Sequence, residues 1–196
     1  MGNFIELPKP KLKGEMSVEE AIAKRRSKRK FTSYELSMEE ISQLLWAGQG
    51  ITDSAKKLRA IPSAGALYPL EIYIVKKDGF YHYIPQGHKL ELLKSEDLRG
   101  GLTGATWGQN FISEAPISIV ICAVRSRVTS KYGLRGGRYV DVEVGHAAEN
   151  IHLEAVSLGL SSVPVGAYSD ESVSRLLELP PDHEPIYIIP VGREKK

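Results

Sequence analysis

The sequence predicts one α+β domain with a mostly antiparallel sheet flanked by helices, and three features carry this prediction. Leu70–Lys76 and Phe80–Ile84 contain strand-forming residues on either side of Asp78-Gly79, a strong hairpin turn. Pro116–Val124 is nearly all apolar, as expected of a central strand that is covered on both faces. Apolar residues then recur at helical spacing from Val140 to Leu158, which predicts the longest helix.

The N-terminal third is predicted to hold an arm, two helices and a loop. Residues 1–14 alternate Pro, Lys and single apolar residues, so we expect an extended arm at the start of a single domain that covers the whole chain. Ser17–Glu20 and Ser37–Glu40 are capping boxes, and each predicts the start of a helix. The second helix should end at Gly48 or Gly50, and the polar residues that follow, as far as position 66, should form a loop.

The middle of the chain gives weaker signals on both sides of the central strand. Residues 85–114 are expected to contain two short helices, around Leu92 and Trp107. Residues 125–138 carry five Arg or Lys and three Gly, which predicts an irregular basic segment before the long helix.

Past the long helix, the chain is predicted to return to the sheet twice. Gly159 stops the helix, and Leu160–Val165 should be extended. Asp170 is the expected cap of a short helix that ends before Pro180-Pro181, and Ile186–Val191 is the predicted last strand.

Composition excludes several classes of protein. The formal net charge is +2, from 26 basic and 24 acidic residues, which is too balanced for a general nucleic-acid binder. The longest apolar run, Ala115–Val124, is too short to span a bilayer, and the N-terminus has no signal-peptide core. The single cysteine, Cys122, excludes an internal disulfide and a cysteine-based metal cage. We therefore expect a cytoplasmic protein with no membrane or nucleic-acid partner.

Common catalytic and nucleotide-binding motifs are missing from the sequence. There is no dinucleotide-binding glycine fingerprint after a strand, no P-loop and no nucleophile elbow. Glu143 and His146 have the spacing of half of a carboxylate-bridged metal site, but the other half is absent, so we expect no metal. Cys122 lies in the most apolar strand and is expected to be a core residue.

Four segments that are far apart in the sequence form a set. They are Arg25–Arg29 after the first helix, Pro62–Pro69 before a strand, Gly159–Gly166 after the longest helix, and Val191–Arg193 near the C-terminus. In this order and at this spacing, the set resembles the nitroreductase family of flavin enzymes over about residues 17–194.

The resemblance implies a fold, a cofactor and a reaction. The fold would be the nitroreductase fold, and the protein would form an intertwined homodimer with two flavins at its interface. A stripe of small residues at Gly145, Ala148 and Ala155 is compatible with close contact between helices. The cofactor would be flavin mononucleotide (FMN), reduced by NADH or NADPH. A small-molecule or peptide acceptor, such as a nitro compound or a quinone, would then enter the same pocket in a ping-pong mechanism. The implied cofactor-binding residues are Arg25, Arg26, Ser27, Arg29, Ser63, Ala64, Gly65, Ala66, Pro164, Val165, Gly166, Ala167, Gly192 and Arg193.

The chemistry of FMN agrees with the residue types at these positions. Its phosphate dianion suits guanidinium groups, and Arg25, Arg29 and Arg193 are expected to converge on it, with Ser27 as a hydroxyl donor. Backbone N–H groups of the Pro164–Ala167 turn are expected near the ring atoms that gain negative charge on reduction. Taken singly, Arg25–Arg29 is also explained as a solvated basic helix end or a nucleic-acid patch. The Pro164–Ala167 turn, taken singly, is also explained as an ordinary connection between a strand and a helix.

One segment departs from the common family pattern, which has Asn at the position of Ala66. The stretch around Ser63–Ala66 instead looks like the branch of SagB-type dehydrogenases, which oxidise peptide azolines to azoles. Lys131 and Tyr132 also resemble that branch, where such a pair is implicated in proton transfer, although a surface loop pair explains them as well. No other catalytic residue is indicated.

Two further hypotheses remain open at the level of sequence. The same phosphate anchors would serve a flavin- or nucleotide-binding module without catalysis. A nucleic-acid-binding domain centred on Lys24–Lys30 is the other, although aromatic residues do not interleave with that cluster.

Overall fold

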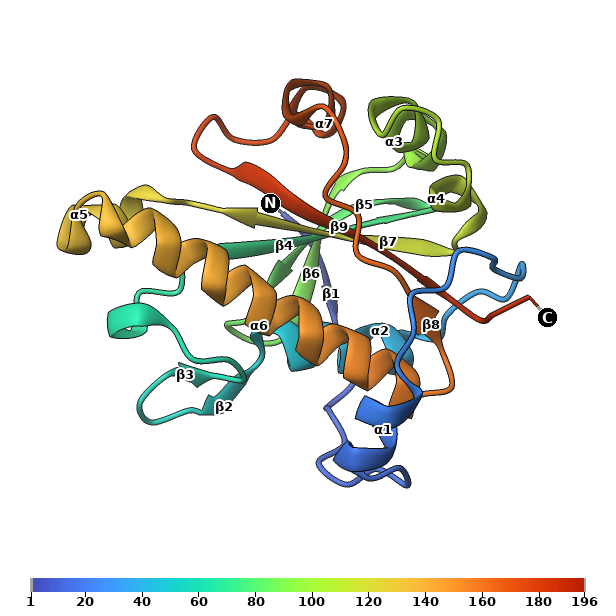
Figure 1. Cartoon of the computed structure of the whole chain (residues 1–196), viewed down its shortest axis with the longest axis horizontal. Coiled ribbons are helices and arrows are strands. Elements are labelled where there is room, and N and C mark those ends of the chain that lie inside the picture. Colours follow the sequence, from blue (N-terminus) through green and yellow to red (C-terminus); the bar gives the residue numbers. More distant parts are fainter. Residues whose placement is uncertain (1, 196) are drawn as a thin grey trace.

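A seven-stranded sheet with helices on both faces organises the chain, and the computed structural model describes it over residues 2–195 (Figure 1). The strand order is β1-β6-β5-β4-β7-β9-β8, and each neighbouring pair is antiparallel. The strands are β1 Asn3–Glu6, β4 Leu70–Lys76, β5 Gly79–Ile84, β6 Lys89–Lys94, β7 Ile117–Ala123, β8 Ser161–Ser162 and β9 Glu184–Gly192. The predicted α+β class is confirmed.

Helices cover the two faces of the sheet unequally. On one face lie α2 (Met38–Gln49) and α6 (Arg135–Ser157); on the other lie α3 (Arg99–Ala105), α4 (Phe111–Glu114) and α7 (Asp170–Leu177) (Figure 1). The short helix α1 (Val18–Lys24) packs on α6. None of the helices within residues 2–195 combines the length and the apolarity that crossing a bilayer requires.

The two faces have separate hydrophobic cores because side chains alternate along each strand. In β4, Ile72 and Ile74 join the core under α2 and α6, whereas Tyr73 and Val75 join the core under α3 and α7. All seven residues of β7 are buried between β4 and β9, which confirms the predicted central strand. The predicted β4–β5 hairpin is confirmed too, with Lys76 opposite Gly79.

Residues at the helix ends explain where α2 begins and where α6 stops. The Ser37 hydroxyl accepts the Glu40 N–H at 3.2 Å, and the Glu40 carboxylate accepts the Ser37 N–H at 2.8 Å, so the predicted capping box is confirmed. Helix α6 is about 34 Å long at 1.5 Å per residue. It ends just before Gly159, whose φ of 71° is a left-handed conformation that favours glycine.

One sequence prediction at the sheet edge is wrong, and two others differ from the structure in detail. Leu92 lies in strand β6, not in a helix, because Leu90 and Leu92 alternate with Lys89 and Glu91. The arm contains a strand, β1, which pairs with β6 and extends the sheet by one strand. The two short helices of this region are α3 and α4, and Trp107 lies between them.

Other differences concern loops that are more ordered than expected. The expected loop before residue 66 holds a small hairpin, β2 (Ile51–Asp53) and β3 (Leu58–Arg59), and a 3₁₀ turn, η1 (Ala64–Ala66). The expected irregular segment is α5 (Ser126–Tyr132) followed by the start of α6, and glycine at 136 lets these two helices approach.

The cap of α7 lies one residue before the predicted Asp170. The Ser169 hydroxyl, not Asp170, caps the helix by accepting the Ser172 N–H at 3.2 Å.

Candidate functional site

The basic segment after α1 lies beside β8 and the end of β9. The Lys28 N–H donates to the Ser162 carbonyl at 3.1 Å, and the Thr32 N–H donates to the Arg193 carbonyl at 2.9 Å. Ser27 also pairs with Ser162 in an isolated parallel bridge. Main-chain hydrogen bonds therefore bring together three of the four segments that form the predicted set. We call Arg25, Arg26, Ser27, Arg29, Gly192 and Arg193 the basic end.

Gly192 allows the chain to pass closely between its neighbours at the basic end. A Cβ atom at this position would lie 2.6 Å from Cδ of Pro116 and 3.0 Å from Cδ1 of Phe31. Both distances are shorter than ordinary packing allows, so the residue before Arg193 has to be small.

The guanidinium groups of Arg25 and Arg26 are turned toward α1 and α6. Arg25 Nε lies 3.7 Å from the Glu149 carboxylate of α6, and both side chains are partly exposed. Arg26 Nη1 donates to the carbonyls of Ala23 and Arg25 at 3.1 and 2.6 Å, which satisfies groups at the end of α1.

Arg29 and Arg193 are turned to other neighbours. The Arg29 guanidinium lies 5.9 Å from the Phe111 ring centre, and that of Arg193 lies 3.4 Å from the Tyr34 ring centre. Arg193 Nη2 is 3.8 Å from Glu40. The four cationic groups share one end of the molecule without converging on a point, and exposed contacts of this kind contribute at most about 1 kcal/mol each.

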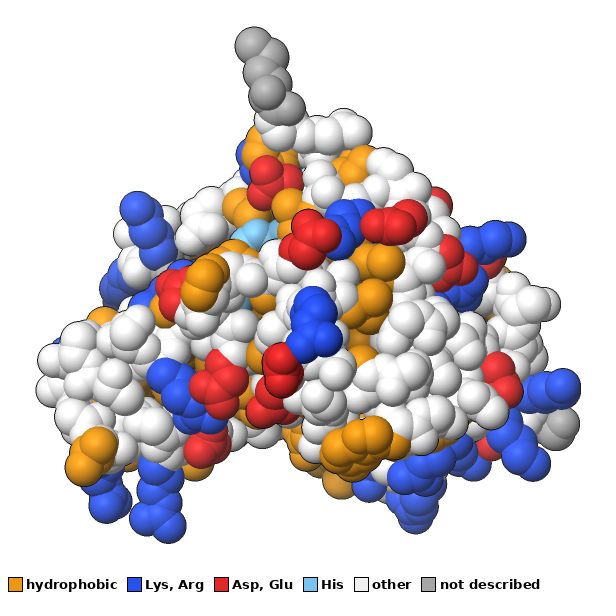
Figure 2. Space-filling view, turned by 90° about the horizontal axis from the view of Figure 1, so that it is seen from above, with side chains coloured by type: hydrophobic (Ala, Val, Ile, Leu, Met, Phe, Trp, Pro, Cys, Tyr) orange, Lys and Arg blue, Asp and Glu red, His pale blue; other side chains and the backbone are white. Residues whose placement is uncertain are grey.

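Cations gather at this end of the surface as well. Lys and Arg side chains stand out at the right-hand end of the space-filling view, and others project at its left-hand end (Figure 2). A hollow of about 490 Å³ is lined by Arg29, Lys30, Asn110, Phe111, Glu114 and Lys195. A larger groove of about 910 Å³ lies between the N-terminal arm, α1, α2 and the last turns of α6, and none of the predicted cofactor residues lines it.

A buried histidine lies behind the basic end. His152 of α6 shares a 2.7 Å hydrogen bond through Nδ1 with the Ser162 hydroxyl, and its Nε2 is buried with no partner among residues 2–195. Burial, followed by the charge of Arg25, lowers the pKa of His152 to about 4. This histidine is therefore neutral at physiological pH.

The Pro164–Ala167 turn crosses the end of the sheet beside β9. Val165 exchanges two backbone hydrogen bonds with Ile188, at 2.8 and 3.0 Å, so its N–H is already used. Gly166 and Ala167 are exposed residues, and their N–H groups donate no hydrogen bond within residues 2–195. Those two amides are the donors that this turn can offer to a ligand.

The Ser63–Ala66 turn lies against Lys131 and Tyr132 of α5. Gly65 has a φ of 64°, and a Cβ atom there would lie 2.8 Å from Tyr132 Oη and 3.0 Å from Lys131 Nζ. The fourth predicted segment and both predicted catalytic candidates are thus neighbours. We call this group the Ser63 turn. It consists of Ser63–Ala66, Lys131, Tyr132 and the buried Glu143, which is described next.

Glu143 of α6 is a buried carboxyl beside this turn. Its side chain is 2% exposed, and neither oxygen has a hydrogen-bond partner among residues 2–195. Burial raises the pKa of Glu143 to about 7, against the opposing effects of the Ser63 hydroxyl, the Arg59 charge and the Gln49 amide. An unpaired buried group of this kind costs about 1–3 kcal/mol or more.

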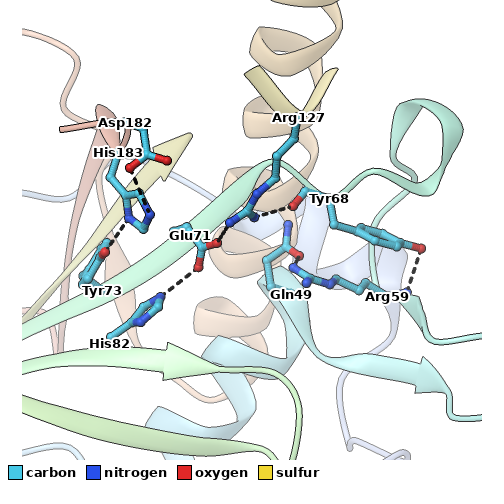
Figure 3. Close-up of polar contacts among 9 residues, drawn as sticks. All are labelled: Gln49, Arg59, Tyr68, Glu71, Tyr73, His82, Arg127, Asp182 and His183. Atoms are coloured by element: carbon cyan, nitrogen blue, oxygen red, sulfur yellow. Dashed lines mark hydrogen bonds and ion pairs between the residues drawn. The ribbon is translucent and has the colours of Figure 1, made fainter. Parts of the chain in front are cut away.

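Arg59 links Glu143 to a polar network that Figure 3 shows. Its Nη1 donates to Gln49 Oε1 at 2.5 Å, and its guanidinium lies 4.6 Å from the Tyr68 ring centre. The Tyr68 carbonyl in turn accepts Arg127 Nη1 at 3.1 Å. The loop between β3 and β4 is therefore tied to α2 on one side and to α5 on the other.

The network continues into the sheet through Glu71. This carboxylate pairs with Arg127 at 2.6 Å and with His82 at 2.8 Å (Figure 3). Burial works to raise the pKa of Glu71, but the bonds to His82 and Arg127 outweigh it and lower the pKa. Unlike Glu143, Glu71 is a partly buried carboxylate with its partners in place.

A family model decides how these segments are to be understood. A model described as the nitroreductase family matches residues 22–193 of the chain. The chain belongs to the nitroreductase family. It is 40% identical over 200 residues to a Methanocaldococcus jannaschii protein provisionally named a nitroreductase, with 99% of both chains covered. A provisionally named nitroreductase from Ralstonia eutropha superposes with a TM-score of 0.90 at 30% identity, covering 98% of this chain and 90% of that one.

Two other nitroreductase-fold proteins have more specific names. The microcin B17-processing protein McbC of Escherichia coli is 27% identical over 157 residues, which are 74% of this chain and 57% of McbC, in agreement with the predicted SagB-type branch. The structure of an NADPH:FMN oxidoreductase from Vibrio harveyi, complexed with NAD⁺, shares the fold with a TM-score of 0.69 at 22% identity, covering 91% of this chain and 69% of that one.

Sequence reasoning missed the buried parts of the site. Glu143 entered only as half of a metal motif, and His152 and Arg59 were not singled out. The one signal in the sequence was a carboxyl within the apolar stripe of α6, between Val140 and Val144.

Proposed function

We propose that this nitroreductase-family oxidoreductase binds FMN, accepts hydride from NADH or NADPH, and then reduces an electron-poor acceptor in the same pocket. The family membership supports this proposal, and the observation that carries it is the main-chain pairing of Ser27 and Lys28 with Ser162 and of Thr32 with Arg193. Three segments of the predicted set become neighbours only because the chain folds this way.

The residues at the basic end suit the phosphate of FMN. Arg25, Arg29 and Arg193 are held by exposed contacts that cost little to exchange for charge-assisted hydrogen bonds to a dianion. Ser27 adds a hydroxyl, and neutral His152 behind Ser162 adds no charge of its own.

The other segments suit the ring system. When bound, FMN supplies reversible two-electron transfer through its isoalloxazine ring, which gains negative charge on reduction. The free N–H groups of Gly166 and Ala167 would donate to that charge, and the Ser63–Ala66 turn would lie against the ring. No side chain has to act as a nucleophile, because the protein's task is to bind the flavin, orient the reactants and exclude water.

A homodimer with flavin at its interface is part of the proposal. Ala148 and Ala155 are buried within their own chain, so the predicted small-residue stripe leaves only Gly145 free for a second copy. Exposed apolar side chains at Leu12 and Val18 along the large groove, with Ile22 also exposed on α1, supply an alternative contact. Sedimentation should show a dimer at micromolar concentration, and a monomer with FMN fully bound would contradict it.

Reconstitution tests the proposed reaction. The purified protein is mixed with FMN, freed of excess cofactor, and mixed rapidly with NADH or NADPH without oxygen. We expect a bound yellow flavin that bleaches with at least one donor and regains its colour when a quinone or nitro compound is added. A protein that takes up no FMN contradicts the proposal, and tightly bound FMN that neither donor bleaches indicates the non-catalytic module.

Azoline oxidation is the second candidate, and the position of Lys131 and Tyr132 favours it. Both side chains reach the Gly65 turn, and the related McbC is named for microcin B17 processing. In this reaction the azoline loses a proton to one of these side chains and a hydride to the flavin. Tyr132→Phe and Lys131→Ala would then abolish azole formation from an azoline peptide while quinone reduction by NAD(P)H persists.

A further inference from the structure

The Glu143 carboxyl is the part of the Ser63 turn that the proposed function leaves unused. It occupies the buried stripe of α6 with Val140, Val144 and Ala147, where an apolar side chain would suit the surroundings better. Both carboxyl oxygens lack a partner among residues 2–195. A carboxyl group that is buried without a partner in an apolar stripe indicates that gaining or losing its proton has a role.

Two donors beside Glu143 are free to turn toward it. The Ser63 hydroxyl accepts the Tyr68 N–H at 2.9 Å, so its own hydrogen remains available to donate. Gln49 Oε1 accepts from Arg59, while Gln49 Nε2 is buried with no partner in the described part of the chain. An ionised Glu143 can accept from both donors, whereas a protonated Glu143 can donate to the Ser63 oxygen instead.

The charged and titratable groups around Glu143 come from several elements. Arg59 of β3 carries the charge that acts on it directly. Glu71 of β4 acts on Arg59 by its charge and is held by Arg127 and His82, while Lys131 and Tyr132 of α5 lie beside Gly65. Glu143 is therefore the carboxyl near this turn that has no ion pair among the described residues.

We propose that Glu143 is a positioning residue that takes up one proton from solvent when negative charge arrives at the Ser63–Ala66 turn, and releases it when that charge leaves. This inference rests on the proposed function, because the arriving charge is that of reduced FMN. A hydride from NAD(P)H brings two electrons and one proton, and leaves one extra negative charge on the flavin. The proton comes from hydronium in the solvent, whose O–H bond breaks as the carboxyl O–H bond of Glu143 forms, and it balances that charge.

The pH dependence of the flavin midpoint potential tests this coupling. One additional proton per two electrons steepens the slope by about 30 mV for each tenfold change in proton concentration. Because the pKa of Glu143 is raised to about 7, the additional slope should begin near that pH and continue above it. It should be present in the wild-type protein and in Glu143→Asp, and absent from Glu143→Gln.

Glu154→Gln is the matched control. Glu154 is another carboxyl of α6 whose pKa burial raises, but it lies near Ser157 and Gln43 and not at the Ser63 turn. The additional slope should survive this substitution. Loss of the slope in Glu154→Gln, or its persistence in Glu143→Gln, overturns the inference.

A measurement without cofactor separates this inference from the proposed function. Infrared spectra of the FMN-free protein should show a carboxylic acid band that titrates near neutral pH and vanishes in Glu143→Gln. Absence of that band overturns the inference even if FMN binds. Failure to bind FMN overturns the proposed function together with the coupling, whereas FMN binding with equal slopes in all variants overturns the coupling alone.

Discussion

The basic end and the Ser63 turn lie beside the same helix but are built in opposite ways. At the basic end, guanidinium groups are partly exposed and rest on aromatic rings, distant carboxylates or carbonyls. At the Ser63 turn, Glu143 is buried and unpaired, and the backbone of Gly65 has a left-handed conformation. The first region can rearrange around an anion at low cost, whereas the second is fixed and responds by gaining or losing a proton.

Of the two regions, the Ser63 turn should contribute more to the pH dependence of the unfolding free energy. The pKa of Glu143 in the folded chain is about 7, above its usual 4.5, so the folded state holds this proton more tightly than the unfolded state. The resulting stability is present below pH 4.5 and is lost as the pH rises toward 7, by about 3 kcal/mol in total.

Glu143→Gln should remove that pH dependence. Urea unfolding at several pH values measures it, and the exposed Glu171→Gln on α7 is the control that should leave the wild-type slope in place. Equal slopes for wild type and Glu143→Gln would mean that the carboxyl ionises normally.

At the basic end, Arg193→Ala should weaken FMN binding about ten- to a hundred-fold, because a charge-assisted hydrogen bond contributes about 1.5–3 kcal/mol. Arg193→Lys should recover only part of this, since an ammonium lacks the planar fork. Fluorescence titration with FMN measures both variants. Lys28 is a poor control because it pairs at 2.8 Å with Glu194, the residue next to Arg193. Arg175→Ala on α7 is a better one, because its ion pair with Glu171 lies away from the basic end (Figure 1). An equal loss in Arg175→Ala would indicate bulk charge and not a specific anchor.

Gly192→Ala should destabilise the fold by about 2 kcal/mol, because its Cβ would overlap Pro116 and Phe31. Gly145→Ala on α6 is the matched control, since a Cβ there meets nothing within 4 Å, and it should be neutral or slightly stabilising. Thermal unfolding of the two variants compares them. A neutral Gly192→Ala would show that the strand end can shift without cost.

Helix α2 joins the two regions, with Glu40 near Arg193 at one end and Gln49 near Arg59 at the other. Ser37→Ala removes the N-terminal cap and should cost about 1 kcal/mol in unfolding free energy. The pH dependence that Glu143 confers should be unchanged. A change in that dependence would mean that the two regions are coupled through α2.

Local rules predicted the parts of the fold that local chemistry controls. The capping box at Ser37, the turn at Asp78-Gly79 and the apolar strand β7 each follow from interactions within a few residues or from uniform burial. Strand β1 and the strand around Leu92 were missed because they stabilise each other, and pairing over such a distance leaves little trace in either segment.

The site divides in the same way. The chemistry of arginine and glycine at the basic end could be recognised in the sequence, together with the order of the segments. The partners of those arginines could not, since Tyr34 and Glu40 reach Arg193 only through the fold. Glu143 was missed because the absence of a partner, unlike the presence of a motif, is visible only in three dimensions.

A crystal structure of the FMN-loaded protein tests the central claim, that the two regions hold one flavin between them. We predict the phosphate in contact with Ser27 and Arg193, and the ring against the Ser63–Ala66 turn within reach of the N–H groups of Gly166 and Ala167. A phosphate remote from Arg193, or FMN seated in the large groove beside α1, would contradict the account.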